Sequence, residues 1–580
     1  VYRAGRWNER TLYDLFRVRH ANIVADPSNW LASLEAAFQM GGGGGGDGEG
    51  GGEGGGPGGG GGSGGGPGVG GGSSGEGGAG TGSSSGGGSG PSSSSVNTNS
   101  GNRLYQLPIV GWSSRGATGV GLTLSHSSLG DNWNGTFGYA WTHSYEWKLD
   151  YTQGSSAIVH AGDGSDYAFT ESSGTFTPPV GVHLDLVRNQ DQTWTLTTKH
   201  GVKFNFTSAG LLSNIRDRNQ NTVTIGRDSN SRVSTVTDPG GKVLEFTYNS
   251  NGRVATVTDP LDREWSFAYS SSGDLTEVTY PEINAQTPTR DFTYNTTHDI
   301  LTEVDLRGNT WTCTYDSQQR MTSWSNPLSQ TTSYSYGTSA TTITFPGSQT
   351  VVHNYSSGLL ASEVDPASFS TSYTYDSSKN VLTVTDKRGK VWTYTYGTKG
   401  NVLTSTNPLS QTTTLTYNSF SQPLTVTNPL SQVTTYTYDS NGNLLTVTDP
   451  LSRTTATVGY DSYGQATSVE DALDRTTTGS YDTHGNVTSV TQPGSITTTA
   501  TYDALNRVAS VTDAGSNTTS VSYDALGRVV LVTNPDDSDV EAAYNLENML
   551  TSSTNELGQT TSITYDAVGK VTTVTNPRGD

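Results

Sequence analysis

VSYDALGRVVLVTNP (Val521–Pro535) is nearly a copy of ATYDALNRVASVTDA (Ala500–Ala514), which lies twenty-one residues earlier. The tyrosine that closes this Tyr-X-Tyr or Phe-X-Tyr pattern, or its equivalent, recurs sixteen times between Tyr248 and Tyr565, and eleven of the fifteen intervals are 21 residues. A fixed period of about 20–50 residues is the signature of a repeat architecture, in which each unit buries its apolar face only against its neighbours.

One unit of the repeat predicts a β-hairpin and a turn to the next hairpin. In TTYTYDSNGNLLTVTDPLSRTT (residues 434–455), Tyr436 and Tyr438 alternate with threonines and so share one face of a strand. Asp439 and Gly442 then favour a turn, because Asp bonds its own backbone and Gly accepts a positive φ. The second strand, LLTVTD, ends at Pro450, which fixes φ and cannot donate to a strand ladder.

Repetition of this hairpin predicts one very long antiparallel sheet. An isolated hairpin is marginal in water, so each must pair with its neighbours. Sixteen tyrosine-marked units of two strands predict about 32 strands, whereas twisted open sheets rarely exceed about 10 without curling. The fold class is therefore all-β, and the sheet is expected to spiral or close, which also limits exposed edges.

Two residue types in the repeat invite a functional reading. Tyrosines on a sheet can bind sugars or bases, and the aspartates that follow them could form acid/base pairs or calcium sites. Packing explains the tyrosines better, because a tyrosine recurs in unit after unit. Turn formation explains the aspartates better, because Asn, which can form a turn but cannot act as an acid or base, replaces Asp at Asn249, Asn295, Asn418 and Asn545. We therefore assign structural roles to Tyr375, Asp376, Tyr438, Asp439, Gly442, Tyr502, Asp503, Tyr523, Asp524, Gly527, Tyr565 and Asp566, and predict no catalytic, cofactor or metal site.

Composition divides the chain into four regions. Residues 1–40 are predicted to be helical, as the end of an upstream domain or as docking helices. Residues 41–102 are rich in Gly and Ser and are predicted to be a flexible, disordered linker. Residues 103–205 contain short non-identical strands and are predicted to form a β-rich cap. The repeats fill residues 206–580, where the sequence stops without a closing element.

Charge and motifs exclude several function classes. The net charge of −21 argues against a nucleic-acid partner, and no run of 18 apolar residues predicts a membrane span. Cys313 is the only cysteine and is expected to be a buried thiol. The best catalytic candidates are His143 and Glu146 in THSYEW, but strand alternation is expected to put them on different faces. The chain is therefore predicted not to be an enzyme.

The unit YDALGRVVLVTNP, together with YDSNGNLLTVTDP, resembles the RHS repeat, also called the YD repeat. The resemblance covers residues 206–580, and the β-rich stretch before them also resembles the region that precedes the repeats in bacterial RHS proteins. It implies a β-strip wound into a hollow shell. In bacterial members such shells enclose a C-terminal toxin, as in polymorphic toxins and insecticidal toxin complexes, and teneurins carry similar shells at the cell surface.

This resemblance leads to two functional hypotheses. In the first, the chain is a non-catalytic shell segment of a bacterial secreted or cell-surface protein, and its partner is a C-terminal toxin or effector domain of the same protein. In the alternative, it is an adhesin or carbohydrate-binding module with a surface or glycan partner. The self-cleaving core motif of toxin-bearing members is absent from these residues, as is a PAAR-like delivery domain.

Overall fold

The structure is a computed structural model that describes residues 93–116, 119–130 and 133–579. Every regular element in these residues is a β-strand, which confirms the all-β prediction. No described segment is a helix long and apolar enough to cross a bilayer.

The main element is one antiparallel sheet of 38 strands, which runs from β11 (Leu184–Arg188) to β48 (Val571–Thr575). Each inner strand pairs with the strands before and after it in the sequence, so the sheet is a single strip. In β35 (Val433–Tyr438) and β36 (Leu444–Thr448), for example, Tyr436 pairs with Val447 and Tyr438 with Leu444. Because antiparallel strands reverse direction, successive turns lie at opposite edges of the strip.

The strip curls because most hairpins contain an irregularity beside the repeat tyrosine. The pairing register shifts between Thr247 and Tyr248 in β17 (Val243–Tyr248), and again between Thr437 and Tyr438 in β35. An extra residue in one strand bends that strand and increases its twist. Repetition of this bulge in hairpin after hairpin gives the strip a consistent curvature.

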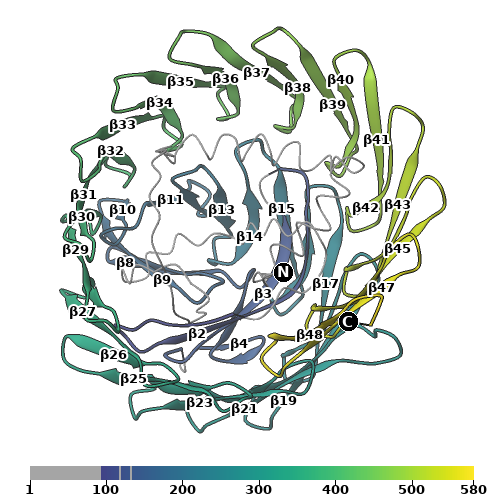
Figure 1. Ribbon diagram of the computed structural model, residues 1–580. Coiled ribbons are helices and arrows are strands. Elements are labelled where there is room, and N and C mark those ends of the chain that lie inside the picture. The colour runs from purple at the N-terminus through teal and green to yellow at the C-terminus, as the bar shows by residue number, and fades with distance from the viewer. Residues whose placement is uncertain (1–92, 117–118, 131–132, 580) are drawn as a thin grey trace, which may run out of the picture.

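The curved strip forms a spiral, and its C-terminal strands return beside β17 and β19 (Glu264–Tyr269) (Figure 1). Lys242 Nζ donates a hydrogen bond of 2.5 Å to the carbonyl oxygen of Ala504, and Arg263 donates one of 2.7 Å to that of Ala525. Both pairs are 262 residues apart, whereas His200 and Phe420, which meet near the start of the spiral, are 220 residues apart, so the windings lengthen along the chain. We call residues 184–417 the first winding and residues 418–579, which begin where Phe420 meets His200, the second winding.

The residues before the strip form a cap that lies inside the first winding (Figure 1). One sheet has the order β1 (Ser93–Val96), β2 (Arg103–Trp112), β3 (Val120–Ser127) and β6 (Trp141–His143). The other has the order β10 (Thr175–Thr177), β9 (Asp166–Ser172), β8 (Ser156–His160) and β7 (Lys148–Thr152), and β4 (Asn134–Gly135) pairs with β5 (Gly138–Tyr139).

The main core lies between this cap and the first winding. The Trp141 and Phe292 ring centroids are 5.7 Å apart, and those of Phe137 and Phe267 are 5.0 Å apart in an edge-to-face contact. Such pairs contribute beyond the apolar area that they bury. The cap therefore anchors the inner face of the strip.

The structure changes two of the predicted boundaries. Strand β1 and the turn after it lie within residues 93–102, where a flexible linker was expected; Ser93 pairs with Gln106, so backbone pairing orders a stretch that composition assigned to a tether. The continuous sheet begins at Leu184 rather than near Phe206 and has 38 strands rather than about 32. Its first strands lack the Tyr-Asp signature but alternate buried and exposed residues in the same way. The helices predicted for residues 1–40 lie outside the described residues.

Candidate functional site

The repeat tyrosines tie each hairpin to the one before it. The Tyr438 hydroxyl donates a hydrogen bond of 2.8 Å to the carbonyl oxygen of Pro423, fifteen residues earlier. Burial raises the pKa of Tyr438 to about 12, so the hydroxyl keeps its proton at neutral pH. The same bond runs from Tyr375 to Leu360, from Tyr502 to Val487, from Tyr523 to Val508 and from Tyr565 to Leu550.

The aspartates after these tyrosines organise the turn that follows, which we call the YD turn. Asp439 Oδ1 accepts hydrogen bonds from the backbone N–H of Asn441 and of Asn443, at 2.9 and 2.8 Å. Gly442 has a φ of +81° in this turn, and Gly527 has a φ of +83° in another. The matching pair of backbone bonds is accepted by Asp376, Asp503, Asp524 and Asp566. Each carboxylate is thus used inside its own turn.

The two faces of the strip differ in chemistry. Phe246 in β17 and Phe267 in β19 point inward, since Phe246 contacts the His143 ring and Phe267 the Phe137 ring of the cap. The threonines between the inward residues point outward, and their hydroxyls pair across strands, as Thr437 and Thr446 do at 2.7 Å. Opposed hydroxyl pairs of this kind stabilise a solvated sheet face.

Beyond the cap, the inward face of the strip carries an aromatic surface. By the same alternation, Tyr373, Trp392, Tyr394, Leu415 and Tyr436 face the interior, from β29 (Ser370–Tyr375), β31 (Val391–Tyr396), β33 (Thr412–Tyr417) and β35. We call these five residues the lumen surface. All but Tyr436 are only half-buried, and none belongs to the cap-wall core cluster of the described residues. The sequence did not lead us to Trp392 or Leu415, although each lies an even number of residues before a repeat tyrosine and so shares its face of the strand.

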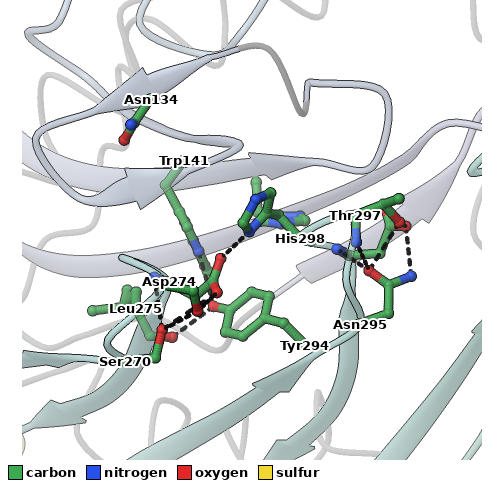
Figure 2. Close-up of polar contacts among 12 residues, drawn as sticks. Asn134, Trp141, Ser270, Asp274, Leu275, Tyr294, Asn295, Thr297 and His298 are labelled. Carbon is green, nitrogen blue, oxygen red and sulfur yellow. Dashed lines mark hydrogen bonds and ion pairs between the residues drawn. The ribbon is translucent and has the colours of Figure 1, made fainter.

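The cap is fastened to the first winding at consecutive YD turns. His298 Nδ1 lies 2.6 Å from Asp274 Oδ1, and the His298 ring stacks on Tyr139 with the centroids 3.9 Å apart. Trp141 Nε1 donates a hydrogen bond of 3.0 Å to the hydroxyl of Tyr294. Figure 2 shows His298 directed at Asp274 and Trp141 reaching Tyr294 from the cap. The Tyr139 stacking and the Trp141 bond hold the cap against the wall, whereas the His298–Asp274 contact joins two neighbouring turns of the wall.

The structure corrects the expectation that His143 and Glu146 lie on different faces. β6 ends at His143, and the chain turns before Glu146, so Glu146 Oε2 comes within 3.9 Å of His143 Nε2. Burial lowers the pKa of His143 to about 3 and raises the pKa of Glu146 to about 7. The His143 side chain is 1% exposed, so this pair is closed to a substrate.

Neither of two open grooves in the described residues holds a catalytic arrangement of carboxylates. One is lined by Trp194, Asn205 and Arg216 among others, and contains no carboxylate. The other contains Asp482 and Asp503, which are YD-turn aspartates bonded to their own backbone. The described residues hold no group of three or more His, Cys, Asp or Glu side chains that could bind a metal, and Cys313 is buried as expected.

Family comparisons agree with this geometry. The Teneurin YD-shell model matches residues 360–472 and 452–580, and the RHS Repeat model matches residues 248–282. Residues 248–282 and 360–580 of this chain are RHS/YD repeats. A third model, Domain of unknown function (DUF6531), matches residues 93–169 of this YD-repeat chain, which is most of the cap. A search of curated proteins found no match.

Solved structures resemble the YD-repeat chain at the level of the fold. The crystal structure of TcdB2-TccC3 without its hypervariable C-terminal region has a TM-score of 0.52 and 12% identity, and the match covers 82% of this chain and 37% of that one. The crystal structure of TcdB2-TccC3 matches with a TM-score of 0.47 and 12% identity, covering 82% of this chain and 35% of that one. The chain thus spans well under two thirds of the length of these structures.

Proposed function

We propose that this chain forms part of the wall of a hollow RHS-type shell that encloses a polypeptide and has no catalysis of its own. The observation that carries this proposal is the lumen surface. An inward, half-buried aromatic surface suits a partly unfolded polypeptide, which offers apolar side chains without a fixed shape. The outward face, in contrast, is a solvated array of threonine hydroxyls.

The enclosed polypeptide in this proposal is a C-terminal toxin or effector domain of the same protein, in a bacterial secreted or cell-surface context. Support comes from TcdB2-TccC3, a protein of similar fold that has a hypervariable C-terminal region. A net charge of −21 keeps such a large exposed β-surface soluble.

Adhesion through glycans is less well supported. An aromatic platform for sugars needs several exposed Tyr or Trp side chains, and Tyr463 is the only such residue among the large exposed hydrophobics of the described part. Its ring is covered by Arg115, whose guanidinium carbon lies 3.7 Å from the ring centroid.

A protease-protection experiment tests the proposal. A poorly folded reporter is joined after residue 580, and its digestion is compared with that of the free reporter. We expect slower digestion in the fusion, and loss of that protection when Trp392→Glu and Tyr394→Glu place charges on the lumen surface. Thr393→Glu and Thr395→Glu on the outward face of the same strand are the matched control. Digestion of the fused and free reporter at the same rate contradicts enclosure.

A further inference from the structure

The first strands of the strip carry an excess of positive charge in an otherwise acidic chain. Residues 184–227, from β11 to β15 (Thr222–Arg227), contain six Lys or Arg residues against three Asp and no Glu. The whole chain, in contrast, has a net charge of −21. A local excess of one sign raises the concentration of ligands of the opposite sign at that surface. This part of the wall is therefore where an anion would be attracted.

Two of these cations lie directly opposite each other on neighbouring strands. Lys203 in β13 (Lys203–Phe206) pairs in register with Arg216 in β14 (Leu212–Arg216). Their neighbours Phe204 and Ile215 are buried in the core, so alternation places Lys203 and Arg216 on the opposite face of the strip. Directly opposed side chains have Cβ atoms about 4.5–5.5 Å apart, and like charges at that distance are destabilising. An anion between the two cations would remove this repulsion.

The protein itself neutralises neither of these two cations. Among the described residues, no carboxylate forms an ion pair with Lys203 or Arg216, and the Arg216 Nε is buried without a hydrogen-bond partner. Other arginines of the first winding differ, since Arg232 and Arg263 each form an ion pair with the aspartate four residues earlier. A buried donor without a partner is costly. Arg216 is thus charged and close to the surface, and it lacks the partner that its counterparts have.

Arg216 also lines the open groove that contains no carboxylate, which has a volume of about 470 Å³. Small-molecule sites commonly have volumes of about 300–1,000 Å³, so the groove has room for more than a single small ion. Its other lining side chains are hydroxyls, amides and aromatic rings, including Ser208, Asn214 and Trp194. Asn205 Nδ2 donates a hydrogen bond of 2.7 Å to Asn214 Oδ1, which holds both amides in place beside Arg216.

We propose that this groove binds a small phosphate ester, with the phosphate group held between Arg216 and Lys203. Two unpaired positive charges match a phosphate monoester, which carries a charge of about −1.5 to −2 at neutral pH, better than they match a single carboxylate. The planar guanidinium donates to two phosphate oxygens at once, and the lysine acts as a point charge. The rest of the ligand lies along the hydroxyl and amide side chains of the groove. The site is on the face opposite the core and does not depend on the lumen surface or on an enclosed polypeptide.

Isothermal titration calorimetry of the whole chain with glycerophosphate tests this site. The ionic strength is held constant, so that screening of the surface charges does not change during the titration. We expect saturable binding, and we expect Arg216→Gln and Lys203→Gln each to weaken it at least about tenfold, because each removes a charge-assisted contact with the phosphate. Lys390→Gln, at an exposed position outside residues 184–227, changes the net charge equally and should leave the affinity unchanged.

Thermal unfolding separates a ligand contact from a purely structural role of Arg216. In a low-salt buffer without phosphate, Arg216→Gln should melt at or above the wild-type temperature, because the repulsion with Lys203 is removed. Glycerophosphate should raise the melting temperature of the wild type but not that of Arg216→Gln, since a ligand stabilises only a folded state that binds it. An arginine that serves packing alone would instead lower the melting temperature in both buffers when it is replaced.

Three results overturn the proposal. The absence of saturable binding by the wild type shows that the groove does not take this class of ligand. Equal affinity for glutarate, a dicarboxylate, assigns the two cations to carboxylates and not to phosphate. An equal loss of affinity in Lys390→Gln and Arg216→Gln shows general attraction to the charge of the chain and no site at the groove.

Discussion

Asn219 and Asn443, which are 224 residues apart in the sequence, exchange two side-chain hydrogen bonds of 2.9 Å between the first and second windings. Each amide donates to the oxygen of the other, and Asn443 is only 9% exposed. A buried amide that loses its partner costs more than an average hydrogen bond contributes. The pair therefore fixes the register between the turn at residues 217–221 of the first winding and the YD turn at residues 439–443.

Replacing one member of this pair should weaken the contact between the windings. We expect Asn219→Ala to lower the free energy of unfolding by about 1–3 kcal/mol, because the buried Asn443 Oδ1 then loses its donor, while the Asn443 amide keeps its bond to Asp439. Urea unfolding followed by circular dichroism measures the change. Asn441→Ala, at an exposed position of the same YD turn, should have little effect. An equally large loss of stability for Asn441→Ala would contradict a specific role of the Asn219–Asn443 pair in holding the windings together.

Two glycines with the same backbone geometry should respond differently to a methyl group. Gly558 has a φ of +70° with open space around it, whereas a Cβ on Gly442 would meet Arg218 Nη1 at 2.5 Å. Gly558→Ala should cost about 1 kcal/mol for the left-handed backbone alone. Gly442→Ala should cost more, because the ends of the Arg218 and Gln422 side chains must also shift, and the Phe420 ring lies 3.0 Å away. Equal losses of melting temperature would mean that the side chains around Gly442 give way at no cost and do not restrict this turn.

The bond between consecutive hairpins can be tested at Tyr438. Tyr438→Phe removes the hydroxyl that donates to Pro423 and leaves that carbonyl without this donor, with an expected loss of about 0.5–1.5 kcal/mol. The outward Thr437→Val is the control, since its hydroxyl pair is exposed and surface changes usually stay within about 0.5 kcal/mol. Thermal unfolding compares the two variants, and a smaller effect at Tyr438 contradicts this role.

The cap should lose stability as the pH rises, because of Glu146. Burial raises the pKa of Glu146 from 4.5 to about 7, so the folded cap holds this proton more tightly than the unfolded chain does. The stabilisation is fully present below pH 4.5 and is lost as the pH rises through about 7. Glu146→Gln removes this dependence and should be more stable than wild type at alkaline pH, by on the order of 2–3 kcal/mol.

Melting temperatures of both proteins at acidic and alkaline pH measure this effect. The variant Glu282→Gln, at an exposed position in the loop after β20 (Leu275–Thr279), should follow the wild type throughout. If the melting temperatures of Glu146→Gln and wild type changed with pH in parallel, the buried carboxyl would not titrate in this range.

The sequence predicted the local structure of the wall well because the hairpin is defined by neighbouring residues. The strand alternation around Tyr436 and Tyr438 and the turn at Asp439 are visible within a dozen letters. The spiral contact was not visible in the same way, because Asn219 meets Asn443 only after the accumulated curvature of many hairpins. Leu505 and Leu526 were the available signal, because the third position of most YD turns is polar and a leucine there departs from the pattern.

The cap was harder to predict because its strands do not repeat. The alternation rule failed at His143 and Glu146, where the strand ends between the two residues. Alternation predicts which face a side chain occupies only within a strand, and the letters THSYEW do not show that the strand ends at His143. The pairing of Ser93 with Gln106 was also not predicted, because a serine-rich segment is expected to be a flexible linker unless its partner strand is known.

The number of residues between stacked turns grows along the spiral, from 220 between His200 and Phe420 to 262 between Arg263 and Ala525, a difference of two 21-residue units. In an ordinary solenoid each unit touches only its neighbours, so the loss of one unit merely shortens the array. Here every hairpin of the second winding also has a distant neighbour. Inserting or removing one 21-residue unit upstream would give every later YD turn a different partner on the first winding. The units are therefore interchangeable in sequence but not in number.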